Sequence, residues 1–158
     1  MNSLIVFVAK YFLYISVLIV GVYWLRASTK DKFSLAWKLV AGGILALAMA
    51  RVSAHFYYDT RPFVAEHIKP LFAHAPDNGF PSDHALLTSF LGFSLLAYSR
   101  RVATVLLLNA VLVGAARVAA HVHSPIDIIG SFVFAGLSAV IIVLLDRIVA
   151  RRSASSWD

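Results

Sequence analysis

The sequence lacks cysteine and is poor in charged residues. With no cysteine among its 158 residues, the chain can form neither disulfide bonds nor thiolate metal sites. Only 14% of the residues are charged, against about a quarter in soluble domains, and 60% are hydrophobic. The mean hydropathy of +0.80 agrees with this imbalance. These scarcities exclude an ordinary soluble domain and indicate an integral membrane protein.

Acidic residues are scarcer than basic ones, with 8 Asp and Glu against 14 Lys and Arg. A basic balance can indicate nucleic-acid binding, but here the basic residues do not form a patch with interleaved aromatic side chains. They stand at the ends of apolar runs, as expected for a membrane protein. We therefore expect membrane lipids, and no nucleic acid, as partners.

Long apolar runs predict the helices. They extend over Leu4–Leu25, Leu35–Tyr57, Ala85–Tyr98, Val102–Ala120 and Ile126–Leu145. About 20 helical residues cross the hydrocarbon core of a bilayer. The third run is short and by length alone could be a re-entrant segment, but counting helix from Ser82 brings it close to a span. With no internal repeat or second domain, residues 1–158 are expected to form one all-α bundle of about five transmembrane helices.

Three polar segments interrupt this apolar sequence, namely 60–62, 80–84 and 117–127. Ionisable residues at the edges of membrane spans are costly and therefore usually functional. The third segment has the spacing R-x5-H-x3-D, formed by Arg117, His123 and Asp127. Arginine binds phosphate through a planar fork of donors, and a histidine braced by a carboxylate is an activated nucleophile or base. The pattern predicts a phosphate-ester or pyrophosphate hydrolase at a membrane surface.

Basic residues in the connections predict the orientation of the bundle. If all five runs cross, three basic groups fall on one side, which the positive-inside rule makes the cytoplasm. These groups are Arg26, Lys30, Lys32 and Lys38; Arg100 and Arg101; and Arg147, Arg151 and Arg152. The N-terminus then lies outside, the C-terminus lies in the cytoplasm, and all three polar segments meet on the extracytoplasmic side.

Each polar segment also has a purely structural interpretation. Ser124 can cap the last helix with Pro125 at its first position, and Ser124-x-x-Asp127 then forms a capping box. The two interpretations are compatible, because a capped helix start is a rigid support for His123. Ser82 or Asp83 can likewise cap the third helix, while a helix N-terminus is also a natural phosphate site. An isolated Arg61 is most often an interfacial side chain that reaches toward lipid headgroups.

The order and spacing of these segments resemble the type 2 phosphatidic acid phosphatase superfamily. Its signature runs K-x6-R-P, then P-S-G-H, then S-R-x5-H-x3-D, and here the parts are Arg61-Pro62, Pro81-Ser82-Asp83-His84, and Ala116-Arg117 followed by His123 and Asp127. The resemblance covers about Arg51–Gly130. Within the superfamily, Asp83 and its surroundings resemble the bacterial undecaprenyl-pyrophosphate phosphatases linked to bacitracin resistance.

The resemblance implies a helical membrane fold, a covalent phosphohistidine intermediate, no cofactor and no required metal. By position, His123 is the nucleophile, Asp127 orients it and His84 is the general acid. Arg61, Arg117 and the segment Ser82–Asp83 hold the phosphoryl oxygens.

Two positions depart from the signature. Ala116 replaces the serine of the third motif, and Ala54 stands where the lysine of the first motif belongs. Arg51 lies three residues earlier, on nearly the same helical face, and is expected to supply the missing cation. His55 is the second choice, since it is turned about 100° away on the helix.

The implied activity is hydrolysis of undecaprenyl pyrophosphate to the monophosphate on the outer face of a bacterial cytoplasmic membrane, which would recycle the carrier lipid for cell wall biogenesis. A related phosphatase acting on phosphatidate, phosphatidylglycerophosphate or a lipid A phosphate is the nearest alternative. A membrane transporter or binding protein for anionic lipid headgroups is a more distant one.

Overall fold

The computed structural model describes residues 2–155, with side chains up to residue 149. This part of the chain is helical and contains no β-strand, only an isolated bridge between Thr60 and Asn78. The helices are α1 (Asn2–Arg26), α2 (Thr29–Phe56), α3 (Pro62–Ala65), α4 (Asp83–Leu95), α5 (Arg100–Ala119) and α6 (Pro125–Ser155). The predicted all-α fold is therefore confirmed, and the connection 59–80 contains the short helix α3.

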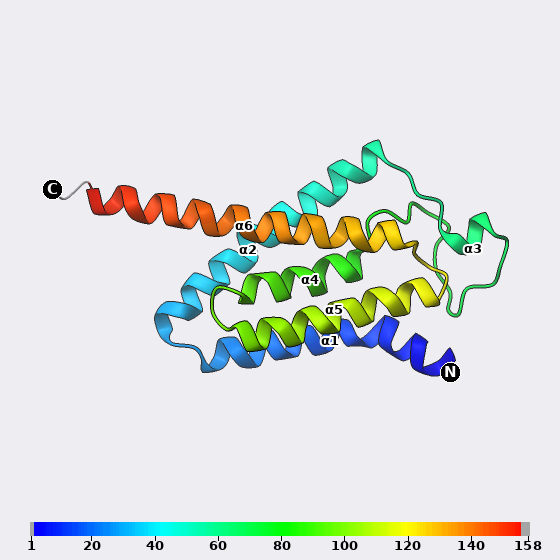
Figure 1. Ribbon diagram of the computed structural model, residues 1–158, viewed down its shortest axis with the longest axis horizontal. Helices are drawn as coiled ribbons and strands as arrows, with labels where there is room; N and C mark the ends of the chain where they lie inside the picture. Colours follow the sequence, from blue (N-terminus) through cyan, green and yellow to red (C-terminus); the bar gives the residue numbers. More distant parts are fainter. Residues whose placement is uncertain (1, 156–158) are drawn as a thin grey trace.

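The five long helices run alternately up and down the bundle (Figure 1). The start of α1, the connection 57–82 and the turn 120–124 consequently lie at one end, here called the polar end. The α1–α2 and α4–α5 turns lie at the other end, here called the basic end, with the last part of α6 projecting beyond it. As predicted, the three polar segments come together. The side chains of Arg151 and Arg152 lie outside the described residues.

Within the described part of the chain, four helices are long and apolar enough to cross a membrane, namely α1, α2, α5 and the part of α6 from Pro125 to Val149. The third predicted span is different. Helix α4 has 13 residues and ends at Leu95 rather than Tyr98, so it is about 20 Å long, less than a bilayer core of about 30 Å. It packs against α1, α2, α5 and α6, and most of its residues are buried. Neighbouring helices rather than lipid surround it.

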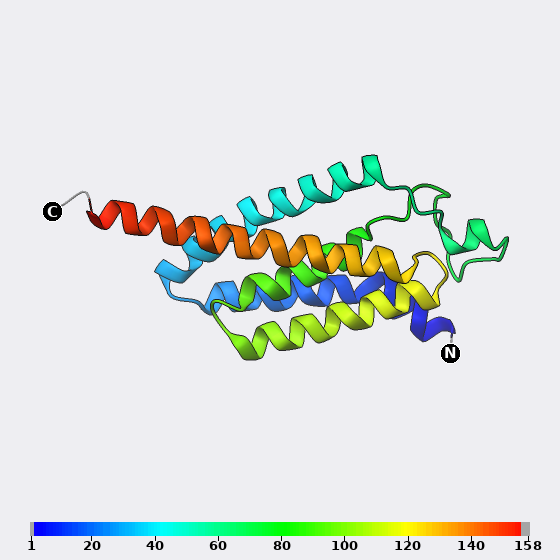
Figure 2. The ribbon, with the colours of Figure 1, turned by 45° about the horizontal axis from the view of Figure 1, so that its top comes forward.

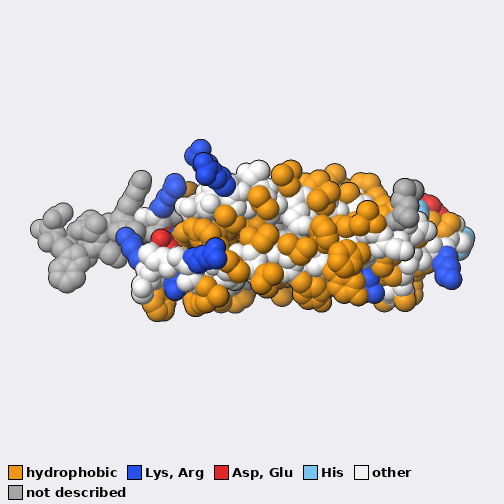
Figure 3. Space-filling view, turned by 90° about the horizontal axis from the view of Figure 1, so that it is seen from below, with side chains coloured by type: hydrophobic (Ala, Val, Ile, Leu, Met, Phe, Trp, Pro, Cys, Tyr) orange, Lys and Arg blue, Asp and Glu red, His pale blue; other side chains and the backbone are white. Residues whose placement is uncertain are grey.

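The outer surface is apolar around the middle of the molecule. Figure 3 shows hydrophobic side chains covering most of this face, with Lys and Arg gathered mainly near one end. Leu18 of α1, Ile44 of α2 and Leu108 of α5 are each more than 60% exposed. In water such a surface would be strongly unfavourable, but it matches the hydrocarbon core of a bilayer. The protein is a multi-pass membrane protein.

Polar side chains inside the bundle join helices that are distant in sequence. Asn109 of α5 donates to the Phe12 carbonyl (2.9 Å) and the Ser16 hydroxyl (2.8 Å) of α1. At the basic end, Lys38 of α2 pairs with Asp146 of α6 at 2.8 Å. Such contacts hold helices together in lipid, where apolar surface alone gives no preference for a protein neighbour.

Candidate active site

A cavity of about 290 Å³ lies at the polar end of the bundle. It lies where α2, the connection 57–82, the first turn of α4, the end of α5 and the turn before α6 meet. Its lining is mostly polar and consists of Ala50, Arg51, Ala54, Arg61, His74, Asp77, Asn78, Phe80, Pro81, Asp83, His84, Arg117 and His123. All three polar segments therefore contribute to one cavity.

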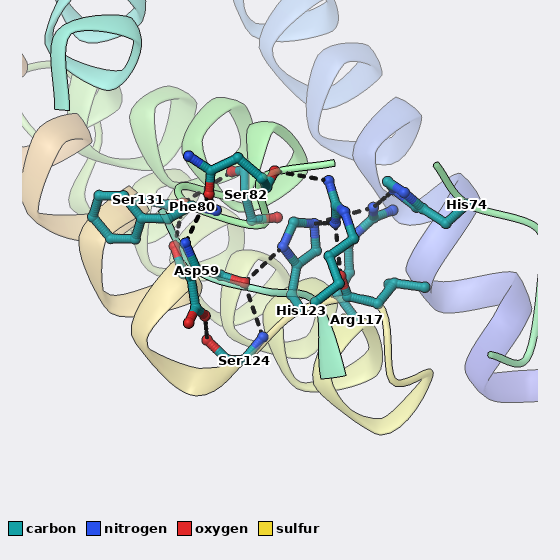
Figure 4. Close-up of polar contacts among 12 residues, drawn as sticks. Asp59, His74, Phe80, Ser82, Arg117, His123, Ser124 and Ser131 are labelled. Carbon is teal, nitrogen blue, oxygen red and sulfur yellow. Dashed lines mark hydrogen bonds and ion pairs between the residues drawn. The ribbon is translucent and has the colours of Figure 1, made fainter. Parts of the chain in front are cut away.

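His123 lies at the centre of the polar contacts (Figure 4). Its ring is only 3% exposed, and Nδ1 lies 3.0 Å from Oδ2 of Asp127, which is fully buried. The predicted contact between these two residues is therefore present. Because a carboxylate only accepts hydrogen bonds, it holds the proton on Nδ1 and leaves Nε2 with a lone pair. This is the tautomer that a nucleophilic histidine requires.

Two guanidinium groups point at the other ring nitrogen. Arg61 Nη1 and Arg117 Nη2 each lie 3.3 Å from Nε2 of His123. Both arginines are buried, with exposures of 5% and 3%. Since guanidinium is always charged and can only donate, Nε2 must be the acceptor. A positive, donor-rich environment therefore surrounds the lone pair of His123.

Backbone and loop contacts fix Arg61. Its Nη1 donates to the Val122 carbonyl at 2.7 Å, its Nη2 donates to the Asn78 carbonyl at 3.2 Å, and its Nε pairs with Asp77 at 2.8 Å. Every nitrogen of the guanidinium thus has a partner, which leaves the group little rotational freedom. Its direction toward His123 is set before any ligand binds.

Arg117 is held between the first helix and the loop. Its Nη1 donates to the Ala9 carbonyl of α1 at 3.4 Å, and its Nη2 donates to Nε2 of His74 at 2.9 Å. The Phe72 ring lies below the guanidinium, 5.7 Å from centroid to Cζ. The Nε of Arg117 is buried and has no partner among the described residues, so one donor remains for a ligand. Figure 4 shows His74 and Arg117 on the same side of His123.

The start of α6 positions Asp127. Pro125 is the first helical residue, as expected, and the backbone N–H of Ser124 donates to Asp127 Oδ2 at 2.9 Å. This is the Asp127 half of the predicted capping box, while the Ser124 hydroxyl donates to Asp59 Oδ2 at 2.5 Å. The carboxylate of Asp59, a residue the sequence analysis did not select, is the better acceptor for that hydroxyl.

Helix α4 begins at the cavity and brings His84 to its wall. Ser82 precedes the helix, but its buried hydroxyl makes no capping hydrogen bond and has no other partner in the part of the chain that the structure describes. Burial, followed by the positive charge of Arg117 and the nearby His123 and His74, lowers the pKa of His84 to about 4. His84 is therefore neutral at pH 7 unless an anion binds beside it and raises its pKa.

Similar forces act on the other ionisable groups of the polar end. Burial lowers the pKa of His123, Asp127 opposes this change, and Arg117 and Arg61 reinforce it. Burial and Arg61 also lower the pKa of His74. Burial alone would raise the pKa of Asp77, but the hydrogen bond and charge of Arg61 lower it overall. The cavity thus contains neutral histidines facing fixed positive charges, an arrangement suited to an anion.

Comparison with known proteins agrees with this geometry. The family model of the PAP2 superfamily matches residues 35–149, which include every residue that lines the cavity. The chain belongs to the PAP2 superfamily. It is 30% identical over 135 residues to undecaprenyl-diphosphatase BcrC of Bacillus subtilis, covering 85% of this chain and 69% of that protein. It is 28% identical over 143 residues to the bacitracin transport permease protein BcrC of Bacillus licheniformis, covering 90% of this chain and 70% of that protein.

A solved structure shares the fold of this PAP2 protein. The crystal structure of Aquifex aeolicus LpxE superimposes with a TM-score of 0.66 at 20% sequence identity, covering 90% of this chain and 87% of that one. At this identity the similarity concerns the arrangement of helices. It agrees with the alternating bundle described above.

This PAP2 sequence departs from the first motif at Ala54, and the structure shows which residues surround that position. Ala54, at the lysine position, lines the cavity, and so does Arg51 one turn away. The Arg51 side chain is 70% exposed, and its Nη2 lies 3.9 Å from Oδ2 of Asp83. His55, the second choice, is not part of the cavity lining, and its ring lies edge-on against Phe56 at a centroid distance of 5.3 Å.

Four residues of this PAP2 site could not be selected from the sequence pattern: Asp59, His74, Asp77 and Asn78. The Asn78 side chain makes four hydrogen bonds that hold the connection 57–82 together and against α2. It accepts from the backbone N–H groups of Asp59 and Phe80, each at 3.0 Å, and donates to two carbonyls at the end of α2. His74 contacts Arg117 Nη2 through its Nε2. The sequence of this loop has no hydrophobic periodicity typical of a helix or a strand. Only its turn-forming residues identify it as a loop, and they do not predict which side chains reach the site.

Proposed function

We propose that the protein is a lipid diphosphate phosphatase that hydrolyses undecaprenyl diphosphate to undecaprenyl phosphate through a phosphohistidine intermediate. The observation that carries this proposal is the environment of His123. A buried carboxylate holds Nδ1, while two buried guanidinium groups converge on Nε2 at the wall of a cavity. Membership of the PAP2 superfamily and the undecaprenyl-diphosphatase relative support the reaction class and the substrate.

In the first step, Nε2 of His123 attacks the terminal phosphorus in line with the bridging oxygen. The N–P bond forms and the P–O bond to the lipid phosphate breaks. His84, made cationic by the bound anion, gives its proton to the departing oxygen. Asp127 stabilises the charge that develops on the ring, as the carboxylate does in a catalytic triad.

In the second step, water attacks the phosphorus of the phosphohistidine. Neutral His84 takes the proton from water, the N–P bond breaks, and inorganic phosphate leaves. Arg61 and Arg117 lie beside Nε2 and therefore beside the equatorial oxygens in both transition states. Fixed donors of this kind supply a large share of the rate enhancement in phosphoryl transfer. Arg117 Nε, which has no partner among the described residues, is a further buried donor on a residue of the cavity lining. Ser82 Oγ also has no partner there, but Ser82 is not part of the cavity lining.

The proposed location is the bacterial cytoplasmic membrane, with the active site on its extracytoplasmic face. Basic residues gather at the end of the bundle opposite the cavity, and basic loops remain in the cytoplasm. At that face the reaction would return the carrier lipid to the monophosphate form used in peptidoglycan synthesis. Conversion of undecaprenyl diphosphate to the monophosphate would also account for a role in bacitracin resistance, which the names of the relatives suggest.

A lipid panel tests the proposal. Purified protein in detergent is incubated with undecaprenyl diphosphate, phosphatidate, phosphatidylglycerophosphate and a lipid A phosphate, and released phosphate is measured. We expect the highest kcat/KM for the diphosphate. His123→Ala should abolish turnover, and Asp127→Asn should lower kcat by about 10²- to 10⁴-fold, because an amide no longer fixes the required tautomer.

His121→Asn is the matched control. His121 lies two residues before His123, is exposed, and has a φ of 63°, a conformation that asparagine tolerates. Full activity in this variant and loss in His123→Ala would locate the chemistry at His123. A higher kcat/KM for one of the monophosphate lipids would identify that lipid, rather than undecaprenyl diphosphate, as the preferred substrate. Binding of anionic lipids without phosphate release from any of them would indicate a binding protein rather than an enzyme.

A further inference from the structure

Two cavities of different character meet at the junction of α2 and α4. The second cavity has a volume of about 270 Å³ and is lined by Gly43, Ala46, Leu47, Leu86, Leu87 and Phe90, together with Arg51 and Asp83. Arg51 and Asp83 also line the polar cavity that contains His123. The polar cavity therefore continues, past this pair, into an apolar groove.

The groove lies between two helices that cross at an angle. Figure 2 shows α2 running obliquely across the bundle. Small residues of α2, Gly43 and Ala46, face Phe90 and Leu86 of α4 across the groove. A Cβ added at Gly43 would meet the Phe90 ring at 3.6 Å, an ordinary van der Waals distance, so the wall of the groove is formed by closely approaching apolar groups of the two helices. A hydrocarbon chain fits this lining, while a charged headgroup does not.

Arg51 differs from the two arginines beside His123. Arg61 and Arg117 are buried and directed at Nε2 by backbone carbonyls, whereas the side chain of Arg51 is 70% exposed. Its distance of 3.9 Å to Asp83 exceeds that of a hydrogen bond. Asp83 thus keeps the guanidinium at the junction without saturating its donors. A phosphate there would meet a positive charge at the point where polar lining changes to apolar lining.

We infer that Arg51 binds the lipid-attached phosphate of a diphosphate substrate and thereby selects diphosphates over monophosphates. The inference rests on the proposed function, because it requires a phosphate to be transferred to His123. The terminal phosphate lies between Arg61 and Arg117, the inner phosphate lies at Arg51, and the first isoprene units enter the groove between α2 and α4. Arg51 then acts on a different phosphate from the one attacked, so it does not simply replace the missing lysine.

The test compares farnesyl diphosphate with farnesyl monophosphate in detergent, for the wild type, Arg51→Ala and Arg51→Lys. Arg51→Ala should lower kcat/KM for the diphosphate about 10-fold or more, which is typical for the loss of a charge-assisted hydrogen bond. It should leave kcat/KM for the monophosphate within about twofold. Arg51→Lys should recover part of the loss. Arg100→Ala, which removes an exposed arginine at the basic end, is the control.

Inhibition constants provide a second measurement that does not depend on turnover of the monophosphate. Arg51→Ala should raise the Ki of inorganic pyrophosphate about 10-fold and leave the Ki of orthophosphate unchanged. Equal losses for both substrates and both inhibitors would mean that Arg51 serves the transferred phosphate, and no loss would mean that it serves neither; both results overturn the inference. A wild type that releases no phosphate from either lipid overturns the proposed function itself.

Discussion

The two ring nitrogens of His123 face opposite electrical environments. Asp127 accepts from Nδ1, and two guanidinium groups donate toward Nε2. Adding a proton to Nε2 would place a third positive charge between Arg61 and Arg117, and all three side chains are buried. This is why burial and the arginines lower the pKa of His123 even though Asp127 opposes them. A neutral, correctly oriented imidazole is the result.

This environment predicts the acid side of the pH profile. A lowered pKa means that Nε2 remains unprotonated as the pH falls through 6.5, the ordinary histidine value, and is protonated only below it. Because only the unprotonated ring can attack, the histidine-dependent acid limb of kcat/KM should lie below pH 6.5. NMR titration of the ring, assigned by its disappearance in His123→Asn, separates this ionisation from that of the substrate. A ring that titrates at or above 6.5 would contradict the prediction.

At the scale of elements, the start of α6 and the segment before α4 are packed against each other without spare room. Gly130 of α6 faces the ring of Phe80, and a Cβ there would lie 2.6 Å from Cζ. The ring cannot easily move, since it also packs edge-on against Tyr57 and Phe134, at centroid distances of 4.9 and 6.0 Å. This contact couples the helix carrying Asp127 to the segment carrying Ser82.

Alanine at two glycines of α6 tests this coupling. Gly130→Ala should force Phe80 outward, lower the thermal midpoint by several degrees and reduce kcat/KM about 10-fold, since overpacking costs about 1–3 kcal/mol. Gly136→Ala is the control in the same helix, because its Cβ would meet Phe93 at an ordinary 3.6 Å. It should be neutral or slightly stabilising, given the higher helix propensity of alanine. Thermal unfolding in detergent and phosphate release measure both effects, and equal behaviour of the two variants would argue against the coupling.

For the whole molecule, the alternating helices determine which residues share an end. The polar connection 57–82 and the turn 120–124 lie together, and the turns at 27–28 and 96–99 lie at the opposite end with several basic residues (Figures 1 and 3). A bilayer around the apolar middle must therefore separate the cavity from the basic turns. The positive-inside rule then predicts the proposed orientation, with the cavity outside.

The absence of cysteine makes this orientation directly measurable. Glu66→Cys, in the loop after α3, and Lys30→Cys, in the first turn of α2, each introduce a single thiol at an exposed position. In bacterial cells whose cytoplasmic membrane is intact and whose cell envelope outside it admits the reagent, a membrane-impermeant maleimide should label the Glu66→Cys protein. The same maleimide should label the Lys30→Cys protein only after the cytoplasmic membrane is permeabilised. The reverse pattern would place the active site in the cytoplasm.

Much of this architecture could be predicted because its signals are local. Apolar runs of about 20 residues predict the long helices, and the interruption of those runs marks the three polar segments. The i, i+4 spacing of His123 and Asp127 places them one helical turn apart, so their contact follows from sequence once α6 begins at Pro125. The position of Arg51 on the cavity wall also follows from helical periodicity. The length of α4 was less predictable, because a helix surrounded by protein need not match the bilayer.

By itself, then, the sequence determined a helical membrane bundle, its alternation and the residues that form its polar end. The tertiary structure alone decided which groups complete the site. His74 reaches Arg117 across 43 residues, Asp59 receives the Ser124 hydroxyl across 65, and Asn78 joins the connection to the end of α2. These contacts depend on the path of an irregular loop, which no periodic pattern encodes. They form because buried donors and acceptors must find partners, and the fold determines which partners are within reach.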